Sequence, residues 1–312
     1  MIGGIAISDD AHPKVICLGL SALDRIWRVQ VPFSGGSEKI RAGEHLTEPG
    51  GMAANAAVAV ARLGGKVFFW GRAGKDDAGR AMADAFTTEG VDIVCFRLFE
   101  DGASSVSGII VDQAGERQIV NFRGSFPTDP GWLPLSSLDA DCVLADPRWP
   151  QGAEALFARA RQLDVPTVLD GDVADTDVFE RLLPFTDHAI FSEPGLSGFA
   201  GPDIGEALAR AASFGSSMVA VTRGDKGVVW LEDGQVHEIP APKVTAIDTT
   251  AAGDVFHGAY AFAIGAGLGT RDSMIFASEV AALKCTRAGG RAAIPTFDEI
   301  RSLERTHHAH TR

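Results

Sequence analysis

The second half of the chain alternates short apolar runs with amphipathic segments, and this pattern restricts the fold more than any other feature. Between residues 141 and 222, four apolar runs of strand length are separated by three segments with helical periodicity. Strands connected through helices at this spacing run parallel in one sheet. The sequence therefore predicts an α/β fold with a doubly wound, mainly parallel sheet and helices on both faces. The predicted strands are residues 141–146, 166–172, 188–193 and 217–222, and the predicted helices are residues 153–162, 178–183 and 204–212.

The remaining segments add to this sheet or form a smaller one. Residues 25–47 and 91–124 hold short alternating segments with no helix between them, which indicates a small, separate antiparallel sheet. No linker or internal repeat divides the chain, so we expect one domain over residues 1–312 with the small sheet inserted. Further predictions are strands at 15–20 and 66–70, helices at 51–63, 77–89, 253–265 and 272–286, and a hairpin at 227–239 with Asp233-Gly234 at its turn.

Composition argues against several functional classes. The formal net charge of −13 leaves no basic stripe for phosphates, so we expect no nucleic-acid partner. No apolar run reaches membrane-spanning length, and the first residues lack the basic start and apolar run of a secretory signal. The four cysteines are scattered without metal-site spacing, which favours reduced core thiols. We therefore expect a cytoplasmic protein without a membrane partner.

The segment from Asp248 to Gly258 is the most informative for chemistry. Two threonines and three small residues lead from Asp248 into a helical segment that has Asp254 at its start. Such a turn exposes backbone N–H groups at a helix N-terminus, where an anion is stabilised. Asp254 could be a simple N-cap, but a cap requires neither the small residues nor the preceding aspartate. Amides that hold a phosphoryl group, beside a carboxylate that accepts a hydroxyl proton, are what phosphoryl transfer to an alcohol needs.

A second motif, residues 48–64, combines a glycine turn with an alanine-rich helix. Gly50 and Gly51 precede this helix, and Asn55 is the polar side chain in its otherwise apolar first turns. A close-packed alanine helix behind a glycine turn would explain the motif without any ligand. Asn55 favours a ligand contact instead, because a polar amide among apolar residues needs a hydrogen-bonding partner.

Together, the two motifs resemble the signatures of the ribokinase-like (PfkB) carbohydrate kinase family. The N-terminal signature corresponds to Gly50-Gly51, Asn55 and Leu63-Gly64, and the C-terminal signature corresponds to Asp248 through Asp254. Further matching segments, at residues 71–79, 221–227 and 289–295, extend the resemblance over nearly the whole chain. The resemblance implies a ribokinase-like fold with a β-sheet lid and the phosphorylation of a sugar hydroxyl by ATP. It also implies Mg²⁺ as a cofactor and allows a monovalent cation.

The resemblance implies roles for the matching positions. Asp254 would be the catalytic base, and the amides of Ala252, Gly253 and Asp254 would form an anion hole. The residues implied to bind the sugar are Asp24, Gly50, Gly51 and Asn55, and those implied to line the nucleotide site are Thr222, Gly224, Gly227, Ala251 and Gly253. The segments 25–47 and 91–124 would form the lid that closes over the sugar and excludes water.

Two positions depart from the family pattern. Ala251 replaces the first glycine of the usual Gly-Ala-Gly-Asp turn, and alanine would be strained there if the turn requires a positive φ. We expect the turn to tolerate alanine. The usual Asn-x-x-Glu element, linked to Mg²⁺ through water, is replaced by Ser192-Glu193-Pro194-Gly195, and we expect Glu193 to take over the metal role.

Three polar residues point to an anionic sugar. Arg148 follows a predicted strand, where α/β proteins bind ligands, while Lys39 and Asn121 lie in the predicted lid. Each could be a solvated surface residue, whereas together they could recognise an anionic substituent. The chain resembles the 6-deoxy-6-sulfofructose kinase branch of the family in the amino-acid sequence of five segments, residues 23–27, 143–149, 168–172, 187–196 and 281–287. That resemblance implies that Lys39, Asn121 and Arg148 bind the sulfonate while the C1 hydroxyl is phosphorylated.

Other functions stay open from the sequence. A kinase for fructose 6-phosphate, ribose, 2-keto-3-deoxygluconate or a nucleoside would share these motifs, and so would a non-catalytic sugar- or nucleotide-binding protein. Asp254 favours catalysis, since binding alone needs no base. A dinucleotide-dependent oxidoreductase is disfavoured, because no Gly-x-Gly-x-x-Gly follows the first predicted strand. An edge strand of the lid is also a candidate surface for a homodimer.

Overall fold

The computed structural model describes residues 7–8, 11–31 and 39–302, and its largest element is a nine-stranded sheet. The strand order is β13-β12-β11-β10-β9-β8-β1-β4-β5, and all neighbours from β11 to β5 run parallel. The hairpin of β12 and β13 is antiparallel. The strands are β1 Lys14–Gly19, β4 Lys66–Gly74, β5 Phe96–Phe99, β8 Cys142–Ala145, β9 Thr167–Gly171, β10 His188–Ser192, β11 Met218–Thr222, β12 Val228–Glu232 and β13 Gln235–Ile239.

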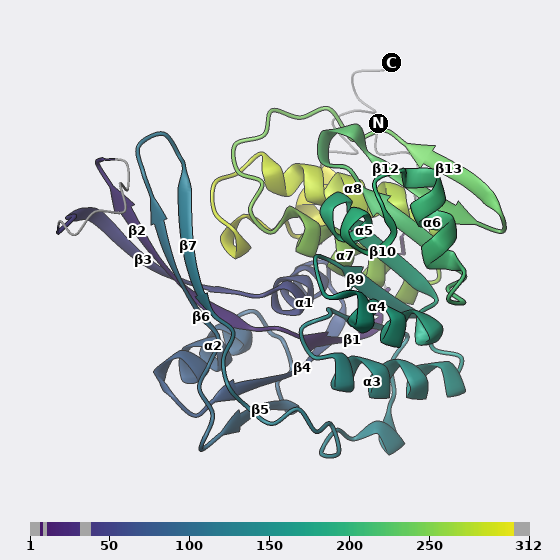
Figure 1. Cartoon of the computed structure of the whole chain (residues 1–312), viewed down its shortest axis with the longest axis horizontal. Coiled ribbons are helices and arrows are strands. Elements are labelled where there is room, and N and C mark those ends of the chain that lie inside the picture. Colours follow the sequence, from purple (N-terminus) through teal and green to yellow (C-terminus); the bar gives the residue numbers. More distant parts are fainter. Residues whose placement is uncertain (1–6, 9–10, 32–38, 303–312) are drawn as a thin grey trace.

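Helices cover both faces of this sheet, so the predicted doubly wound α/β fold is confirmed (Figure 1). Side chains of β1 alternate between two cores: Val15 and Cys17 enter one, and Ile16 and Leu18 enter the other. A strand buried on both faces is apolar at every position for this reason. One face carries α1 Met52–Arg62, α2 Asp77–Thr88, α7 Ala252–Gly265 and α8 Thr270–Cys285, and the other carries α3 Pro150–Gln162, α4 Thr176–Leu182, α5 Glu193–Ala200 and α6 Ile204–Ala212. Among the described residues, no helix is long and apolar enough to cross a membrane.

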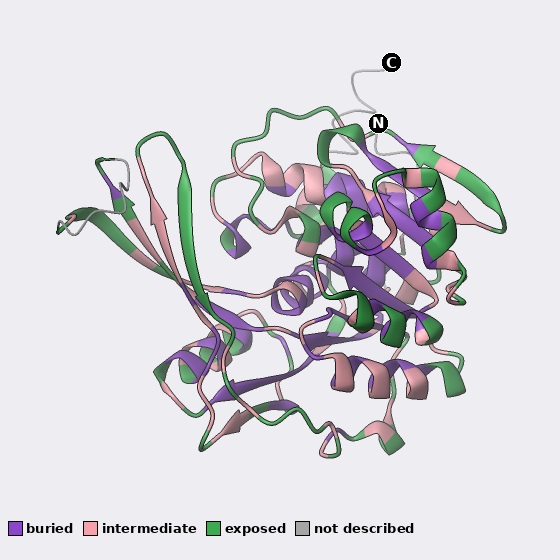
Figure 2. Cartoon of the chain, in the orientation of Figure 1, coloured by how far each residue is buried: buried purple, intermediate pink, exposed green. Residues whose placement is uncertain are grey.

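A four-stranded sheet, which we call the lid, projects from one side of the large sheet (Figure 1). Its strand order is β3-β2-β6-β7, and β2 and β6 are parallel to each other. The strands are β2 Ala22–Val29, β3 Ala42–Gly50, β6 Val106–Val111 and β7 Arg117–Phe122. The edge strand β7 is exposed along its whole length (Figure 2). The lid starts three residues after β1 ends, so its base lies at the carboxyl edge of the large sheet.

One segment predicted for the small sheet lies elsewhere. The sequence places residues 91–124 in that sheet, but β5 pairs in parallel with β4 at the edge of the large sheet. The prediction was wrong here because α2 lies between β4 and β5 and makes them a β-α-β unit, which the four residues of β5 are too few to reveal. Phe96 anchors the strand, with its ring 5.5 Å from the rings of Phe69 and Phe86. The hairpin prediction is confirmed, since Asp233 and Gly234 both have positive φ, at 51° and 73°.

Helices α1 and α7 approach closely at Gly258. A Cβ atom there would lie 2.4 Å from the carbonyl oxygen of Ala56 and 2.9 Å from its Cα. Because both obstacles are backbone atoms, we expect Gly258→Ala to lower the free energy of unfolding by about 1–3 kcal/mol in urea titrations. The matched control is Gly198→Ala in α5, where a Cβ would meet nothing within 4 Å. That variant should gain up to about 1 kcal/mol, and equal stability of the two variants would contradict the close contact.

Candidate active site

The predicted catalytic turn follows β13 in the chain and runs into the start of α7. It lines the same groove as the loop after β11. The Asp248 carboxylate holds this turn by accepting hydrogen bonds from the amides of Thr250 at 2.9 Å and Gly289 at 3.0 Å. The buried Lys284 donates from Nζ to the Asp248 carbonyl oxygen at 2.9 Å. Burial alone would raise the pKa of Asp248, but the hydrogen bonds outweigh it and lower that pKa. Asp248 is therefore an ionised anchor of the turn.

Asp254 is held by a chain of polar side chains. Asn55 Nδ2 donates to Asp254 Oδ2 at 2.7 Å, and Arg291 Nε donates to Asn55 Oδ1 at 3.1 Å. Burial and then the charge of Asp170 raise the pKa of Asp254 to about 7, although the bond from Asn55 opposes this rise. A carboxyl group that titrates near neutral pH is suited to general-base catalysis. Asn55, predicted as a sugar contact, is here the partner that orients this carboxylate.

The N-terminus of α7 supplies amides that can hold an anion. Gly253 and Asp254 lie in its first turn, where N–H groups have no acceptor within the helix. The Ala252 N–H instead donates to the Thr249 carbonyl oxygen at 3.2 Å. The structure therefore offers the amides of Gly253 and Asp254, and the role of the Ala252 amide stays a prediction. A Cβ atom at Gly253 would meet nothing within 4 Å, so open space adjoins the turn.

Ala251 adopts the left-handed conformation, with φ 62° and ψ 13°. The turn therefore requires a positive φ, and it keeps alanine at a cost of about 1 kcal/mol relative to glycine. We expect Ala251→Gly to raise the free energy of unfolding by about 1 kcal/mol, measured by denaturant titration. The control Ala209→Gly, at an exposed position in α6, should lower it by about the same amount. A loss of stability in Ala251→Gly would show that the turn is not strained.

Two glycines bring the start of α1 against Asp24. A Cβ atom at Gly50 would lie 2.7 Å from Asp24 Oδ2, and one at Gly51, where φ is 103°, would lie 2.4 Å from the Leu20 carbonyl oxygen. Arg291 Nη2 donates to the Gly50 carbonyl oxygen at 3.4 Å, which links this glycine turn to Asn55. Burial raises the pKa of Asp24. The structure thus connects the residues predicted to bind the sugar, namely Asp24, Gly50, Gly51 and Asn55.

A groove of about 280 Å³ runs beside the catalytic turn and contains most residues predicted to line the nucleotide site. Thr222, Gly224, Gly227 and Gly253 line it, whereas Ala251 is not among its lining residues. Gly227 has φ 86°, and a Cβ atom there would lie 2.1 Å from the Ile239 carbonyl oxygen, so the tight turn requires glycine. Much of the wall is apolar, as an aromatic base needs.

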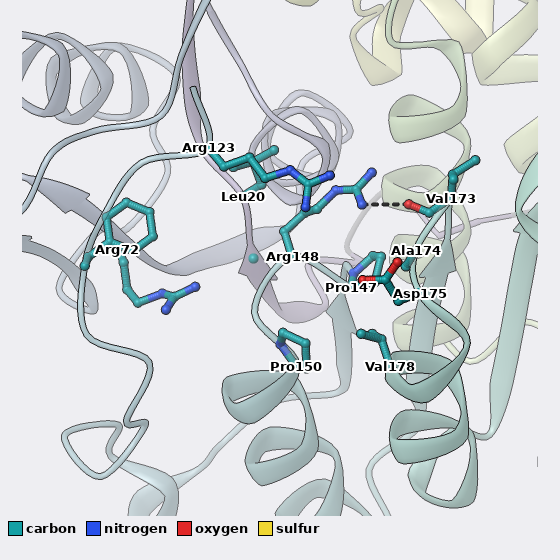
Figure 3. Close-up of a pocket in the computed structure, with 12 residues that line it drawn as sticks. Leu20, Arg72, Arg123, Pro147, Arg148, Pro150, Val173, Ala174, Asp175 and Val178 are labelled. Atoms are coloured by element: carbon teal, nitrogen blue, oxygen red, sulfur yellow. Dashed lines mark hydrogen bonds between the residues drawn. The ribbon is translucent and has the colours of Figure 1, made fainter. Parts of the chain in front are cut away.

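A separate cavity of about 300 Å³, which we call the arginine cavity, is lined by Arg72, Arg123 and Arg148 (Figure 3). The buried Arg72 guanidinium lies 4.8 Å from the ring centroid of Phe126 and 4.2 Å from that of Trp149. Burial lowers the pKa of Arg72 to about 10, so it stays charged at neutral pH. Arg148 forms a 2.9 Å ion pair with Asp172 and donates to the Val173 carbonyl oxygen at 2.7 Å. Three cations around one cavity of an acidic chain favour an anionic ligand.

Comparison with known proteins decides the family. The model of the pfkB family carbohydrate kinases matches residues 12–297. The chain belongs to this family. It is 30% identical over 293 residues to the ribokinase of Haemophilus influenzae, covering 90% of this chain and 95% of that protein. It is 34% identical over 292 residues to the fructokinase of Klebsiella pneumoniae, covering 84% and 94%. The crystal structure of ribokinase from Thermotoga maritima matches with a TM-score of 0.82 at 26% identity, covering 94% of this chain and 99% of that one.

The predicted family, fold and enzyme class are therefore confirmed, and the protein is a carbohydrate kinase. The names of the relatives refer to ribose and fructose, and none refers to a sulfonated sugar. The assignment to the sulfofructose branch stays a prediction.

Helix α5 of this pfkB kinase, which was not predicted from the sequence, begins at the segment that departs from the family pattern, Ser192-Glu193-Pro194-Gly195. Ser192 caps the helix by accepting a hydrogen bond from the Gly195 amide at 3.1 Å. Glu193 is exposed in the first turn, where a negative charge stabilises a helix. Proline in the first turn is also favourable. Helix initiation explains these residues, and the metal role of Glu193 stays a prediction. Within the described part of the chain, no three His, Cys, Asp or Glu side chains cluster to hold a metal.

Of the three residues predicted to bind an anion, Arg148 lines the arginine cavity and the other two do not. Asn121 lies on β7 and donates from Nδ2 to the Ser107 hydroxyl at 3.2 Å. Lys39 is exposed and lies between the end of β2 and the start of β3. The structure therefore does not bring these three side chains together. It places Arg72 and Arg123 beside Arg148 instead, and neither was predicted from the sequence.

Proposed function

We propose that this carbohydrate kinase transfers the γ-phosphoryl group of ATP to a sugar hydroxyl, with Asp254 as the base that accepts the hydroxyl proton. The observation that carries this proposal is the position of Asp254 at the N-terminus of α7, where Asn55 orients its carboxylate from 2.7 Å. The adjacent amides of Gly253 and Asp254 would stabilise the charge that builds up on the transferring group. A base and an anion site in one helical turn provide what the reaction requires.

The remaining parts of the site have complementary roles in this proposal. ATP would occupy the groove lined by Thr222, Gly224 and Gly227, with its γ-phosphoryl group toward Gly253. The lid would cover the sugar and keep water from competing with it. Mg²⁺ prefers oxygen ligands such as carboxylates. The residue proposed to hold it is Glu193, whose side chain is exposed directly after β10. When bound, the ion would neutralise charge on the β- and γ-phosphates.

The substrate proposed is a ketose with an anionic group far from the reacting hydroxyl. The arginine cavity supports this class, because Arg72, Arg123 and Arg148 line a single space. Arginine suits sulfonate, phosphate or carboxylate oxygens, since its planar guanidinium donates several hydrogen bonds. Our specific candidate is 6-deoxy-6-sulfofructose, phosphorylated on its C1 hydroxyl. Lys39 and Asn121 remain proposed sulfonate contacts, which would require the lid to move relative to the structure described.

The proposal is tested by an ADP-release assay with 6-deoxy-6-sulfofructose, fructose 6-phosphate, fructose, ribose, adenosine and 2-keto-3-deoxygluconate, followed by phosphorus NMR of the product. We expect the highest kcat/KM with an anionic ketose and a new phosphate ester on C1. Turnover confined to fructose or ribose would overturn the proposal of an anionic substrate but would keep the proposed kinase reaction. No phosphorylation of any sugar would overturn the proposed reaction.

A neutral sugar is the second candidate, and the named relatives favour it. The two curated relatives described above are called ribokinase and fructokinase. Arg148 is also already paired with Asp172, so it could act as a purely structural residue. The fructose and ribose arms of the assay decide between these candidates.

Two further proposals concern the setting of the enzyme. The exposed strand β7 carries the apolar residues Ile119, Val120 and Phe122, which are 59%, 78% and 49% exposed. An exposed apolar edge strand is a candidate surface for pairing with a second copy, so we propose a homodimer formed through the lid. Light scattering of the intact chain and of a Val120→Lys variant would test the dimer.

We also propose a cytoplasmic location, where ATP is available.

A further inference from the structure

We propose that His257, supported by Asp170, is a positioning residue that fixes the Gly253–Asp254 peptide and aims its N–H at the transferring phosphoryl group. This inference rests on the proposed kinase reaction and concerns a histidine to which we assigned no role from the sequence. His257 lies one turn after Asp254 on α7 and is 2% exposed.

The imidazole ring is held at both nitrogens. Nδ1 lies 2.7 Å from the Gly253 carbonyl oxygen, and Nε2 lies 3.0 Å from the Ile190 carbonyl oxygen on β10. A carbonyl oxygen can only accept a hydrogen bond, so each contact is favourable when the facing nitrogen carries a proton. A neutral imidazole carries one proton and donates to one of the two oxygens, and we take the shorter contact as the donated bond, from Nδ1–H to the Gly253 oxygen. His257 therefore lies between the start of α7 and the interior strand β10 of the large sheet.

The Gly253 carbonyl and the Asp254 amide belong to the same peptide group. A peptide is planar, so a bond that fixes its oxygen also fixes the direction of its N–H. Donation to the oxygen polarises the peptide as well and strengthens the N–H as a donor. The Asp254 N–H is one of the two amides that the proposed reaction uses. Through this peptide, His257 acts on the anion site without touching either substrate.

Asp170 lies beside the same ring nitrogen that faces Gly253. Its Oδ2 lies 3.5 Å from His257 Nδ1, and the carboxyl group is 3% exposed at the end of β9. Burial lowers the pKa of His257, whereas the hydrogen bonds to Ile190 and Gly253 raise it. The other charged groups acting on the ring are Asp254 on its own helix and Asp172 after β9, and both favour a protonated ring. Burial raises the pKa of Asp170 well above its usual range, so its carboxyl group supports the ring through its close position beside Nδ1 and not as a full counter-charge.

A purely structural explanation also exists. A buried histidine can satisfy two backbone carbonyls and stabilise the fold without affecting the reaction. The two explanations differ in what a substitution changes. A structural histidine supports folding stability, whereas a positioning residue changes kcat in a protein that is still folded. The substitution His257→Asn separates them, because the amide N–H takes the place of Nδ1–H toward the Gly253 oxygen while the Nε2 contact with Ile190 is lost.

The test compares His257→Leu, His257→Asn and Asp170→Asn in the full chain, using the best sugar from the assay above. Loss of one anion-site donor costs about 10²–10³-fold in kcat, so loss of its support should cost about tenfold to a hundredfold. We expect that drop in His257→Leu, with KM for ATP and for sugar changed less than about threefold. We expect His257→Asn to keep kcat within about threefold of the parent. Asp170→Asn should lie between the two variants.

The matched control is His188→Leu, which removes a half-buried histidine at the start of β10, where Nδ1 lies 3.0 Å from the Tyr260 hydroxyl. It should lower the melting temperature without lowering kcat. The inference is overturned if His257→Leu keeps the parent kcat, or if His257→Asn loses as much as His257→Leu while both variants remain folded by circular dichroism. Failure of the proposed reaction itself has a different result, because the parent chain would then phosphorylate no sugar.

Discussion

Replacing Asp254 with asparagine is expected to lower kcat for sugar phosphorylation by about 10²–10⁴-fold, the usual contribution of a general base. The amide cannot take the hydroxyl proton, but its oxygen can still accept the hydrogen bond from Asn55. KM for ATP should stay within about threefold of the parent, because the groove that holds the nucleotide is unchanged. Coupled-assay kinetics at saturating sugar and ATP measure the loss.

Stability provides the first control for Asp254→Asn. Burial raises the pKa of Asp254 to about 7 in the folded protein, far above that of an aspartate in an unfolded chain. The stability that this proton contributes is fully present below about pH 4 and is lost as pH rises from about 4 to about 7. Asparagine carries no such charge, so the variant should melt at pH 8 no lower than the parent does.

A second control is Asp272→Asn, which changes an exposed aspartate in the first turn of the neighbouring helix α8. It removes the same charge from the same position in a helix and should leave kcat within twofold. Full activity in Asp254→Asn, or equal losses in the two variants, would show that Asp254 is not the base.

Replacing Arg148 with methionine is expected to raise KM for the anionic sugar by about tenfold to a hundredfold. A hydrogen bond to a charged group contributes about 1.5–3 kcal/mol, and each 1.4 kcal/mol is a factor of ten in affinity. KM for ATP should not change, since Arg148 lines the arginine cavity and not the nucleotide groove. Initial-rate kinetics with each substrate varied in turn measure both constants.

Arg148→Met also breaks the ion pair with Asp172, so the control must lose a comparable pair elsewhere. Arg181 on α4 pairs with Glu154 outside both cavities, and Arg181→Met should leave both KM values unchanged. An Arg148→Met enzyme with unchanged affinity for its best sugar would exclude recognition of an anion by this residue. The neutral-sugar proposal would then be preferred.

The sequence predicted the parallel sheet well because buried parallel strands carry an unmistakable apolar pattern. Strands β8 to β11 and helices α3, α4 and α6 lie where the alternation placed them. It failed at β5, where the expected lid strand belongs to the large sheet. It also missed α5, whose first residues were interpreted as a metal element. In both cases a short segment carries a weak periodic pattern, and its partners in the fold decide its structure.

The catalytic turn could be predicted because its chemistry is local in sequence, from Asp248 to Asp254. The arginine cavity could not, since Arg72, Arg123 and Arg148 come from three distant segments that only the folded chain brings together. Lys39 and Asn121 show the converse: suitable chemistry in the lid segments carries no information on their distance from Arg148, and their role stays a prediction. The conformation of Ala251 was an open question in the sequence, and its φ of 62° settles that the turn is strained.

The role of Asp254 is tested most directly by the pH dependence of kcat/KM for the sugar between pH 5 and 9. This ratio reports the ionisation of the free enzyme, and the base must be unprotonated to accept the hydroxyl proton. With the pKa of Asp254 raised to about 7, we predict that kcat/KM falls tenfold per pH unit below about pH 7 and is constant above it. A profile that stays flat from pH 8 down to pH 5 would contradict Asp254 as the base.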